Sequence, residues 1–251
     1  MQTSPPPRRT DVQGLRALAS LLVASYHIWF GGVSGGVDVF FALGGYLLAA
    51  SLLRQTERDG RIGVRRSLWS QVQRLFPMAA IVLVVTGTIT LVPSGPLHLN
   101  AVLGDLLAAA TFTENWRLVD TGTAYVDAGL DKSFVQHFWA MGVQGQFTAA
   151  CILAAALVAA LLGARARQRM RVALGATLVA VAVGSFAYAL VRVAEAPEAA
   201  YFDTGARAWQ LALGGATYLL VARVRIPTLL RVALATAGVA LVLTAGLLPR
   251  E

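Results

Sequence analysis

The sequence predicts an all-α fold, a polytopic transmembrane helical bundle with about seven crossings plus a re-entrant or partly inserted helix. Hydrophobic residues make up 57% of the 251 residues and charged residues only 14%, whereas an ordinary soluble domain has about 25% charged residues. Several stretches run for about 20 residues without a charge, which is the length that crosses a hydrocarbon core of about 30 Å. One soluble core cannot bury this much apolar surface, so we expect a membrane protein.

The apolar stretches predict the elements in order along the chain. Residues 1–12 are polar and proline-rich and form a tail that has no reason to fold alone. Residues 101–113 are apolar but too few to cross, so they predict the re-entrant or partly inserted helix. The later half of residues 54–74 could form an amphipathic helix on the membrane surface. The predicted crossings are residues 13–30, 35–53, 75–92, 134–162, 172–193, 205–222 and 229–247, with Pro77 in the first turn of the third, where proline is tolerated.

The 21 basic residues divide unequally between the two sides of this layout. If the N-terminal tail and the loops 54–74, 165–171 and 223–231 face the cytoplasm, that side holds 15 basic residues and the opposite side four. This satisfies the positive-inside rule, provided that residues 101–113 do not cross. The layout therefore predicts a multi-pass protein of the cell (inner or plasma) membrane with a cytoplasmic N-terminus. It also explains the net charge of +8 without nucleic-acid binding.

Two polar residues in the first predicted crossing, Arg16 and His27, are functional candidates because burying such groups in a bilayer is costly. Eleven residues make about three helical turns, so both side chains project from one face, about 16 Å apart along the axis. This pair suits a long substrate with an anionic head at Arg16 and its reacting end at His27. The alternative is an arginine that reaches the membrane boundary and a hydrogen-bonded core histidine. Asp38, at the glycine-rich start of the second crossing, could orient the imidazole or cap its own helix.

Four segments carry recognisable motifs. The first joins Arg16 and His27, ten residues between them, to the run Gly36-Val37-Asp38-Val39-Phe40-Phe41. The others are Arg74-Leu75-Phe76-Pro77, residues 137–147 (HFWAMGVQGQF) and residues 201–210 (YFDTGARAWQ). In content and order these segments resemble the integral-membrane acyltransferase family three, the O-antigen and peptidoglycan O-acetylase type. By this resemblance, residues 13–247 form one transmembrane acyltransferase-like domain.

The resemblance implies an enzyme, an acyltransferase that moves an acyl group, usually acetyl, from cytoplasmic acyl-CoA to a hydroxyl of an extracytoplasmic glycan or lipid-linked molecule. His27 would be the general base, a role that needs a group neutral near operating pH, with Asp38 beside it. Arg16 and Arg74 would bind the coenzyme A phosphates, although Arg74 also suits a positive-inside anchor. We expect no permanently bound cofactor and no metal, and we include membrane lipid and a homo-oligomer among the partners. The substrate-binding candidates are Trp139, Gln144, Arg207 and Trp209.

The chain departs from the family pattern at several positions. The replacements are Gly44 for a serine, Ser70 and Gln71 for paired arginines, Gln144-Gly145 for a glutamate pair, and Gln210 for a glutamate. The resemblance also leads us to expect that the chain lacks the family's last crossings at its C-terminal end. Because glutamine forms hydrogen bonds but carries no charge, these departures favour a second hypothesis, a catalytically impaired acyltransferase-like protein that acts as an assembly partner. A lipid or anion transporter with Arg16 lining the path is a third.

Overall fold

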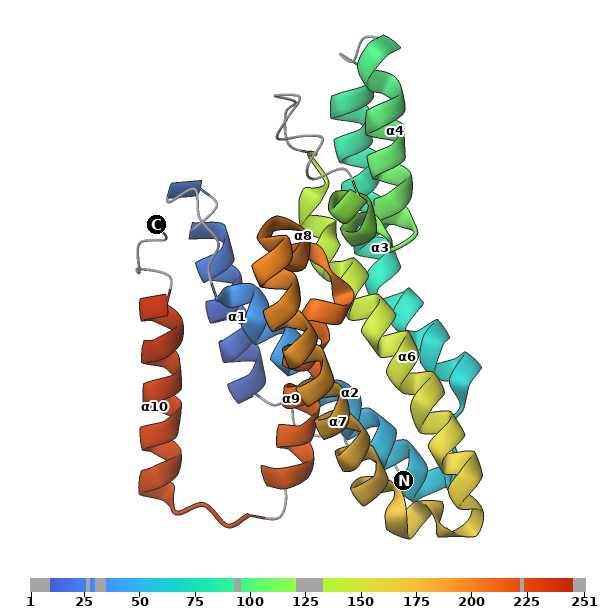
Figure 1. Cartoon of the computed structure of the whole chain (residues 1–251), viewed down its shortest axis with the longest axis vertical. Coiled ribbons are helices and arrows are strands. Elements are labelled where there is room, and N and C mark those ends of the chain that lie inside the picture. The colour runs from blue at the N-terminus through green and yellow to red at the C-terminus, as the bar shows by residue number, and fades with distance from the viewer. Residues whose placement is uncertain are drawn as a thin grey trace, which may run out of the picture.

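The computed structural model describes residues 10–25, 28–29, 35–92, 96–120, 133–221 and 224–245. This part of the chain consists of helices joined by short turns and connections, as the sequence predicts (Figure 1). Its helices are α1 (Thr10–Ser25), α2 (Gly36–Asp59), α3 (Val64–Leu91), α4 (Pro96–Ala110), α6 (Trp139–Leu162), α7 (Ala166–Glu195), α8 (Pro197–Phe202), α9 (Thr204–Val221) and α10 (Thr228–Ala245). Short 3-10 turns, Gln136–Phe138 and Gly163–Arg165, precede α6 and α7.

Three stretches of the described chain are long and apolar enough to cross a membrane. They are Gly36–Asp59, Val64–Leu91 and Gln136–Glu195, and the last contains both α6 and α7. The 24 residues of α2 extend about 36 Å at about 1.5 Å per residue, more than a hydrocarbon core of about 30 Å. Shorter apolar helices cover Leu99–Ala110 and Thr228–Thr244. Each predicted crossing overlaps a helix of the structure, while the number of crossings stays a prediction.

The centre of the bundle is a close contact between α2 and α9, and α7 also packs along α9. Gly45 and Gly214 make this contact possible. A Cβ atom at Gly45 would collide with the Leu211 carbonyl oxygen, and one at Gly214 would collide with the Ala42 carbonyl oxygen. Since any side chain at these positions would separate the helices, the two glycines let the backbones touch. The contact fixes the two helices whose first turns carry predicted site residues.

Helix α3 begins earlier than the sequence predicts. It is continuous from Val64 to Leu91, with Pro77 in its interior instead of its first turn. The separate surface helix predicted for the later half of residues 54–74 is therefore wrong. The physical reason is length: 28 residues extend about 42 Å, so the basic first turns continue the same helix beyond a core of about 30 Å. Gly60 ends α2 at a φ of 70°, a conformation that glycine adopts readily.

Residues 101–113 occupy α4 and the turn that follows it. Helix α4 lies beside α3 (Figure 1), and its 15 residues extend about 22 Å, less than the hydrocarbon core. The chain then turns at Phe112, whose φ of 60° is unusual for a residue other than glycine. A further helix covers residues 114–120. The structure therefore shows a short apolar helix here, and its re-entrant placement stays a prediction.

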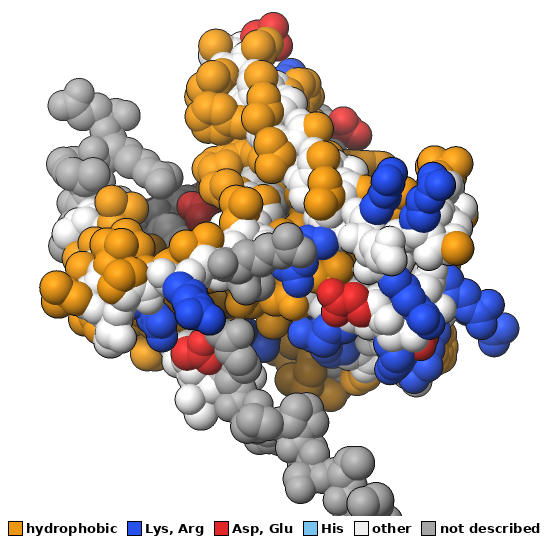
Figure 2. Space-filling view, turned by 90° about the horizontal axis from the view of Figure 1, so that it is seen from below, with side chains coloured by type: hydrophobic (Ala, Val, Ile, Leu, Met, Phe, Trp, Pro, Cys, Tyr) orange, Lys and Arg blue, Asp and Glu red, His pale blue; other side chains and the backbone are white. Residues whose placement is uncertain are grey.

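The arginines of the α2–α3 and α6–α7 connections gather at one end of the bundle, which we call the basic end. Figure 2 views the molecule from this end and shows many arginine side chains on it. Arg167 Nη2 donates a hydrogen bond to the Arg58 carbonyl oxygen at 3.0 Å, and Arg171 Nη2 lies 3.9 Å from Glu57 Oε1. Two segments that the positive-inside layout assigns to the cytoplasm therefore meet in space.

Candidate active site

Asp38 lies in the first turn of α2 and contacts two side chains of α9. Gln210 Nε2 donates a hydrogen bond to Asp38 Oδ1 at 2.6 Å. Arg207 Nη1 lies 3.4 Å from the same oxygen and forms an ion pair with it. Residues three apart in a helix are neighbours on its surface, so Arg207 and Gln210 approach Asp38 together. We call these three residues the Asp38 cluster.

The glycine contact between α2 and α9 explains how this cluster forms. Asp38 precedes Gly45 by seven residues, and Arg207 precedes Gly214 by seven. Seven residues make about two helical turns, so each polar residue lies on the same face as its glycine. The glycine-rich start of the second predicted crossing indicates close helix packing but leaves the partner helix open. Helix α1 does contact α2, but the glycines at positions 45 and 214 join α2 to α9.

Aromatic rings surround the Arg207 guanidinium. Its Cζ lies 4.4 Å from the centroid of the Tyr201 ring and 5.8 Å from that of Trp139, and its Nε donates to the Tyr201 carbonyl oxygen at 2.9 Å. Trp139 is 6% exposed and meets Phe41 edge-on, with ring centroids 5.8 Å apart. Cation–π contacts strengthen when the groups are desolvated. The structure therefore brings together three predicted site residues: Asp38, Trp139 and Arg207.

Gln144 lies on α6, between one and two turns after Trp139, and contacts α2 at Gly44. A Cβ atom at Gly44 would lie 3.0 Å from Gln144 Nε2, so a serine at this position would require the amide to move. Two of the departures from the family pattern, Gly44 and Gln144, therefore lie against each other. The missing side chain at position 44 makes room for the amide.

Trp209 lies on a different face of α9 from the Asp38 cluster. Two residues correspond to a rotation of about 200° from Arg207. The Trp209 ring packs against Phe186 of α7, with centroids 5.3 Å apart, and its backbone N–H donates to Ser185 Oγ at 2.8 Å. The predicted contact of Trp209 with substrate stays a prediction.

Arg74 lies near a small polar pocket between α2 and α3. The Arg74 side chain is exposed, and its Nη2 donates to Gln71 Oε1 at 2.5 Å. Gln71 lines the pocket, which has a volume of about 110 Å³. Its other polar lining residues are Ser51, Gln55, Arg66, Ser67 and Ser70. Hydroxyl, amide and guanidinium donors at one place suit an anionic or amide-containing ligand.

Arg16 is exposed on α1, where its carbonyl oxygen accepts a hydrogen bond from Ser20 Oγ at 3.0 Å. His27 lies outside the described residues. The predicted approach of Asp38 to His27 is therefore still a prediction, as are the roles of Arg16 and Arg74 in donor binding.

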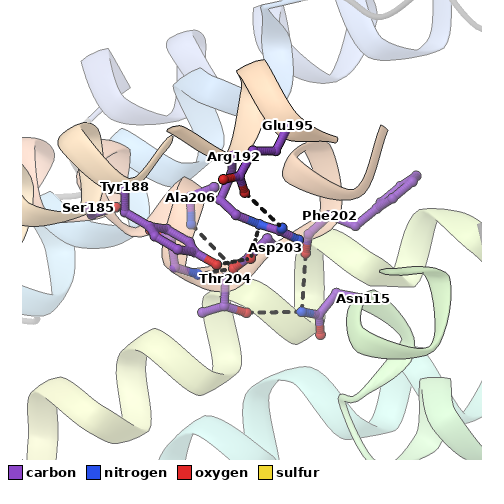
Figure 3. A network of polar contacts seen from close by, with 10 residues as sticks. Asn115, Ser185, Tyr188, Arg192, Glu195, Phe202, Asp203, Thr204 and Ala206 are labelled. Atoms are coloured by element: carbon purple, nitrogen blue, oxygen red, sulfur yellow. Dashed lines mark hydrogen bonds and ion pairs between the residues drawn. The ribbon is translucent and has the colours of Figure 1, made fainter. Parts of the chain in front are cut away.

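A second polar network fixes the start of α9 (Figure 3). Asn115 is fully buried and donates to the Phe202 carbonyl oxygen at 3.2 Å and to Thr204 Oγ1 at 3.0 Å. Gln146 of α6 donates to Asn115 Oδ1 at 2.9 Å and accepts from Thr204 Oγ1 at 2.6 Å. Connected buried hydrogen bonds hold their groups in one arrangement. Because Arg207 follows Thr204 by three residues, this network positions the guanidinium.

Asp203 caps the start of α9 in the same region (Figure 3). Its Oδ1 accepts hydrogen bonds from the backbone N–H groups of Gly205 at 2.6 Å and Ala206 at 3.4 Å, as N-cap residues do. Its Oδ2 accepts from the Tyr188 hydroxyl at 2.8 Å and lies 3.7 Å from Arg192 Nε. The positioning roles of Asp203 and of the Asn115 network are not among the roles predicted from the sequence. An aspartate just before an apolar stretch was the signal for the cap.

Glu114 is a buried carboxyl group next to this network. It is 0% exposed, and neither of its carboxyl oxygens has a hydrogen-bond partner in the described part of the chain. Burial raises the pKa of Glu114 to about 8, and the nearby Asp105 carboxylate adds to the rise. Asp105 forms an ion pair with Arg117 at 2.5 Å. Since desolvation disfavours the charged form, Glu114 is mostly protonated at neutral pH.

A larger groove of about 350 Å³ runs between α6 and α7. Gln146 and Thr204 border it, and most of the other lining side chains are apolar. No member of the Asp38 cluster lines it. We therefore place the candidate active site at the Asp38 cluster and not in this groove.

Long apolar helices with a polar cluster held between them define a multi-pass integral membrane protein. A family model described as an acyltransferase domain (Acyl_transf_3) matches residues 9–251. The chain belongs to this acyltransferase family, which confirms the resemblance that its motifs show.

The chain is similar to bacterial O-acetyltransferases. It is 32% identical over 140 residues to peptidoglycan O-acetyltransferase OatA of Listeria monocytogenes, covering 55% of this chain and 22% of that protein. It is 27% identical over 212 residues to "Putative peptidoglycan O-acetyltransferase YrhL" of Bacillus subtilis, covering 83% of this chain and 33% of that protein. The matched regions thus span a third or less of these relatives' length. No solved structure matches the chain.

Proposed function

We propose that this protein transfers an acyl group, most simply acetyl, from cytoplasmic acyl-CoA to a hydroxyl group of an extracytoplasmic glycan or lipid-linked acceptor. Membership of the acyltransferase family supports the reaction class. The names of two relatives favour peptidoglycan as the acceptor. The observation that carries the proposal is the Asp38 cluster, because it joins a charged residue of one motif to a charged residue of another, 169 positions away.

The proposed reaction assigns a role to each member of the site. His27 removes the proton of the acceptor hydroxyl as its oxygen attacks the thioester carbon of acyl-CoA. The C–S bond then breaks, and the proton passes to the coenzyme A thiolate, so the reaction releases no net proton. Asp38 orients the imidazole of His27 and stabilises its charged form. Arg207 supplies positive charge where the tetrahedral intermediate carries negative charge, and Trp139 and Gln144 border the same site.

The donor end of the site lies at the basic end of the bundle. Arg74 and the polar pocket that contains Gln71 and Arg66 suit the phosphates and the amide-bearing arm of coenzyme A. Arg16 adds a cation from α1. Paired arginines are absent from positions 70 and 71, so Arg66 and Arg74 carry the cationic part of this end.

The proposed layout has seven crossings and one re-entrant segment, with residues 1–12 in the cytoplasm and residues 13–247 forming one domain. The meeting of residues 54–74 and 165–171 at the basic end supports it, because both segments must face the same side under the positive-inside rule.

The test is transfer of labelled acetyl from acetyl-CoA to soluble peptidoglycan fragments by the purified protein in lipid nanodiscs. We expect labelled ester with the wild type and a loss of at least about 100-fold with His27→Ala, which is the scale of general-base catalysis. His98→Ala is the matched control, since it removes another histidine that has no assigned role.

Equal transfer by the wild type and His27→Ala would contradict the base assignment. No transfer by either protein would favour the second hypothesis, an assembly partner that keeps the acyltransferase fold without turnover.

A further inference from the structure

Gln210 is the least explained residue of the Asp38 cluster. It is 7% exposed, on the face of α9 that packs against α2. Its Nε2 donates to Asp38 Oδ1 at 2.6 Å. The reversed amide would direct its carbonyl oxygen at a carboxylate oxygen, and two acceptors repel each other. The chemistry of Asp38 therefore determines which way the amide lies.

The amide oxygen of Gln210 accepts no hydrogen bond from the described residues. Gln210 Oε1 is buried, and no described residue donates a hydrogen bond to it. A buried acceptor that forms no hydrogen bond costs free energy, so native proteins rarely keep one without a reason. The Asp38 carboxylate holds the amide in this orientation even though the amide oxygen is unsatisfied. The arrangement is ready to accept a hydrogen bond from a ligand.

We propose that Gln210 is an acceptor-binding residue: Nε2 holds Asp38 in place, and Oε1 receives a hydrogen bond from a hydroxyl group of the incoming polyhydroxylated acceptor. This inference rests on the proposed function. An ionised carboxylate at this position would lie against Asp38 and could not donate a hydrogen bond to it. Glutamine supplies the donor and the acceptor at every pH.

Two substitutions separate these roles. Gln210→Met has a similar shape but removes both the donor and the acceptor. Gln210→Glu keeps the shape and donates to Asp38 only while the introduced carboxyl is protonated. Among the described residues, the charged or titratable groups near Gln210 are Asp38 from α2, with Arg207 from α9 and Tyr201 from α8 next to Asp38. The titratable residue of helix α6 is Cys151, which lines the groove between α6 and α7, and Tyr188 and Arg192 of α7 contact Asp203.

The experiment measures the KM for soluble peptidoglycan fragments, the KM for acetyl-CoA, kcat, and fragment binding by equilibrium dialysis, from pH 6 to 9. Gln210→Met should weaken fragment binding and lower kcat/KM for the fragments about 10- to 100-fold, with the KM for acetyl-CoA unchanged. Gln210→Glu should lose fragment affinity progressively as pH rises, relative to the wild type. Gln168→Met, which changes an exposed glutamine of α7, should behave as the wild type.

Three outcomes decide the matter. If the wild type transfers acetyl and both Gln210 variants bind fragments as tightly at every pH, the inference is wrong and the proposed function stands. If the wild type binds fragments through Gln210 but transfers nothing, the inference stands and the catalytic proposal fails. A loss in Gln210→Met that appears only in the KM for acetyl-CoA would also overturn the inference.

Discussion

Single residues of the candidate site act through several contacts at once. Arg207 uses Nη1 for Asp38, Nε for the Tyr201 carbonyl oxygen, and its flat face for the rings of Tyr201 and Trp139. A lysine ammonium is a compact point charge and cannot reproduce this fork and this stacking together. Arg207 therefore fixes the shape of the site as well as its charge.

Glu114 predicts how stability depends on pH. Its ordinary pKa is 4.5, and burial raises the pKa in the folded protein to about 8. Between these values the folded state holds a proton that the unfolded state has released, so stability falls as pH rises through this window. We expect Glu114→Gln to remove this decrease, because the amide is neutral at every pH. The thermal midpoint of the variant should exceed that of the wild type by about 5 °C or more at pH 9 and by much less at pH 5.

The measurement is thermal unfolding in one detergent from pH 5 to 9. Asp59→Asn is the control, because this carboxylate is exposed and, among the described residues, forms an ion pair with its neighbour Arg58. Parallel curves for the wild type and Glu114→Gln across the whole range would show that Glu114 ionises in the folded protein as an ordinary carboxyl does.

At the scale of elements, the α2–α9 contact decides whether the site exists. We predict that Gly45→Ala lowers the free energy of unfolding by about 2–4 kcal/mol, because its Cβ would collide with the Leu211 carbonyl oxygen. The same substitution should reduce transfer activity by separating Asp38 from α9. Thermal unfolding and acetyl transfer, measured on the same preparation, check both effects.

Gly184→Ala is the matched control for this prediction. Gly184 is also helical, but nothing lies within 4 Å of a Cβ atom at its position. Alanine favours helix over glycine by up to about 1 kcal/mol, so this variant should be as stable as the wild type or more stable. Equal stability of Gly45→Ala and Gly184→Ala would mean that α2 and α9 do not touch as the structure shows.

The helices could be predicted from the sequence, but their partners could not. Long apolar runs determine where helices form, because a bilayer crossing requires about 20 such residues. The start of α3 was missed because the arginines of residues 54–74 resemble a surface segment, whereas a long helix simply extends past the hydrocarbon core. The glycines of α2 predict close helix packing but not the partner helix. The structure identifies this partner as α9.

Only part of the site could be predicted, because the sequence does not reveal which helices pack together. Asp38, Trp139 and Arg207 lie in separate motifs, and the structure brings them together. Gln210 was noted only as a departure from the family pattern. Its hydrogen bond to Asp38 joins residues 172 positions apart, and no local pattern reveals such a contact. The buried position of Asn115 could not be predicted, because in the sequence a buried asparagine looks the same as an asparagine in a polar loop.

At the scale of the whole molecule, the proposed donor pocket and the Asp38 cluster lie at different depths along the helix bundle. Asp38 is in the first turn of α2, and Arg58 of the basic end is in its last turn. Twenty residues separate them, which is about 30 Å along the helix. The polar pocket at Ser51 and Gln55 is about 20–25 Å from Asp38 by the same measure. Under the proposed function, donor binding and acyl transfer should therefore depend on different residues.

This separation leads to the most direct test of the claim that the Asp38 cluster is the active site. The measurement is the steady-state transfer of acetyl to peptidoglycan fragments by Asp38→Asn, with Asp59→Asn as control. We predict that kcat falls at least about 100-fold, while the KM for acetyl-CoA stays within about twofold of the wild-type value, because the donor pocket is distant. A wild-type kcat in Asp38→Asn would contradict the account.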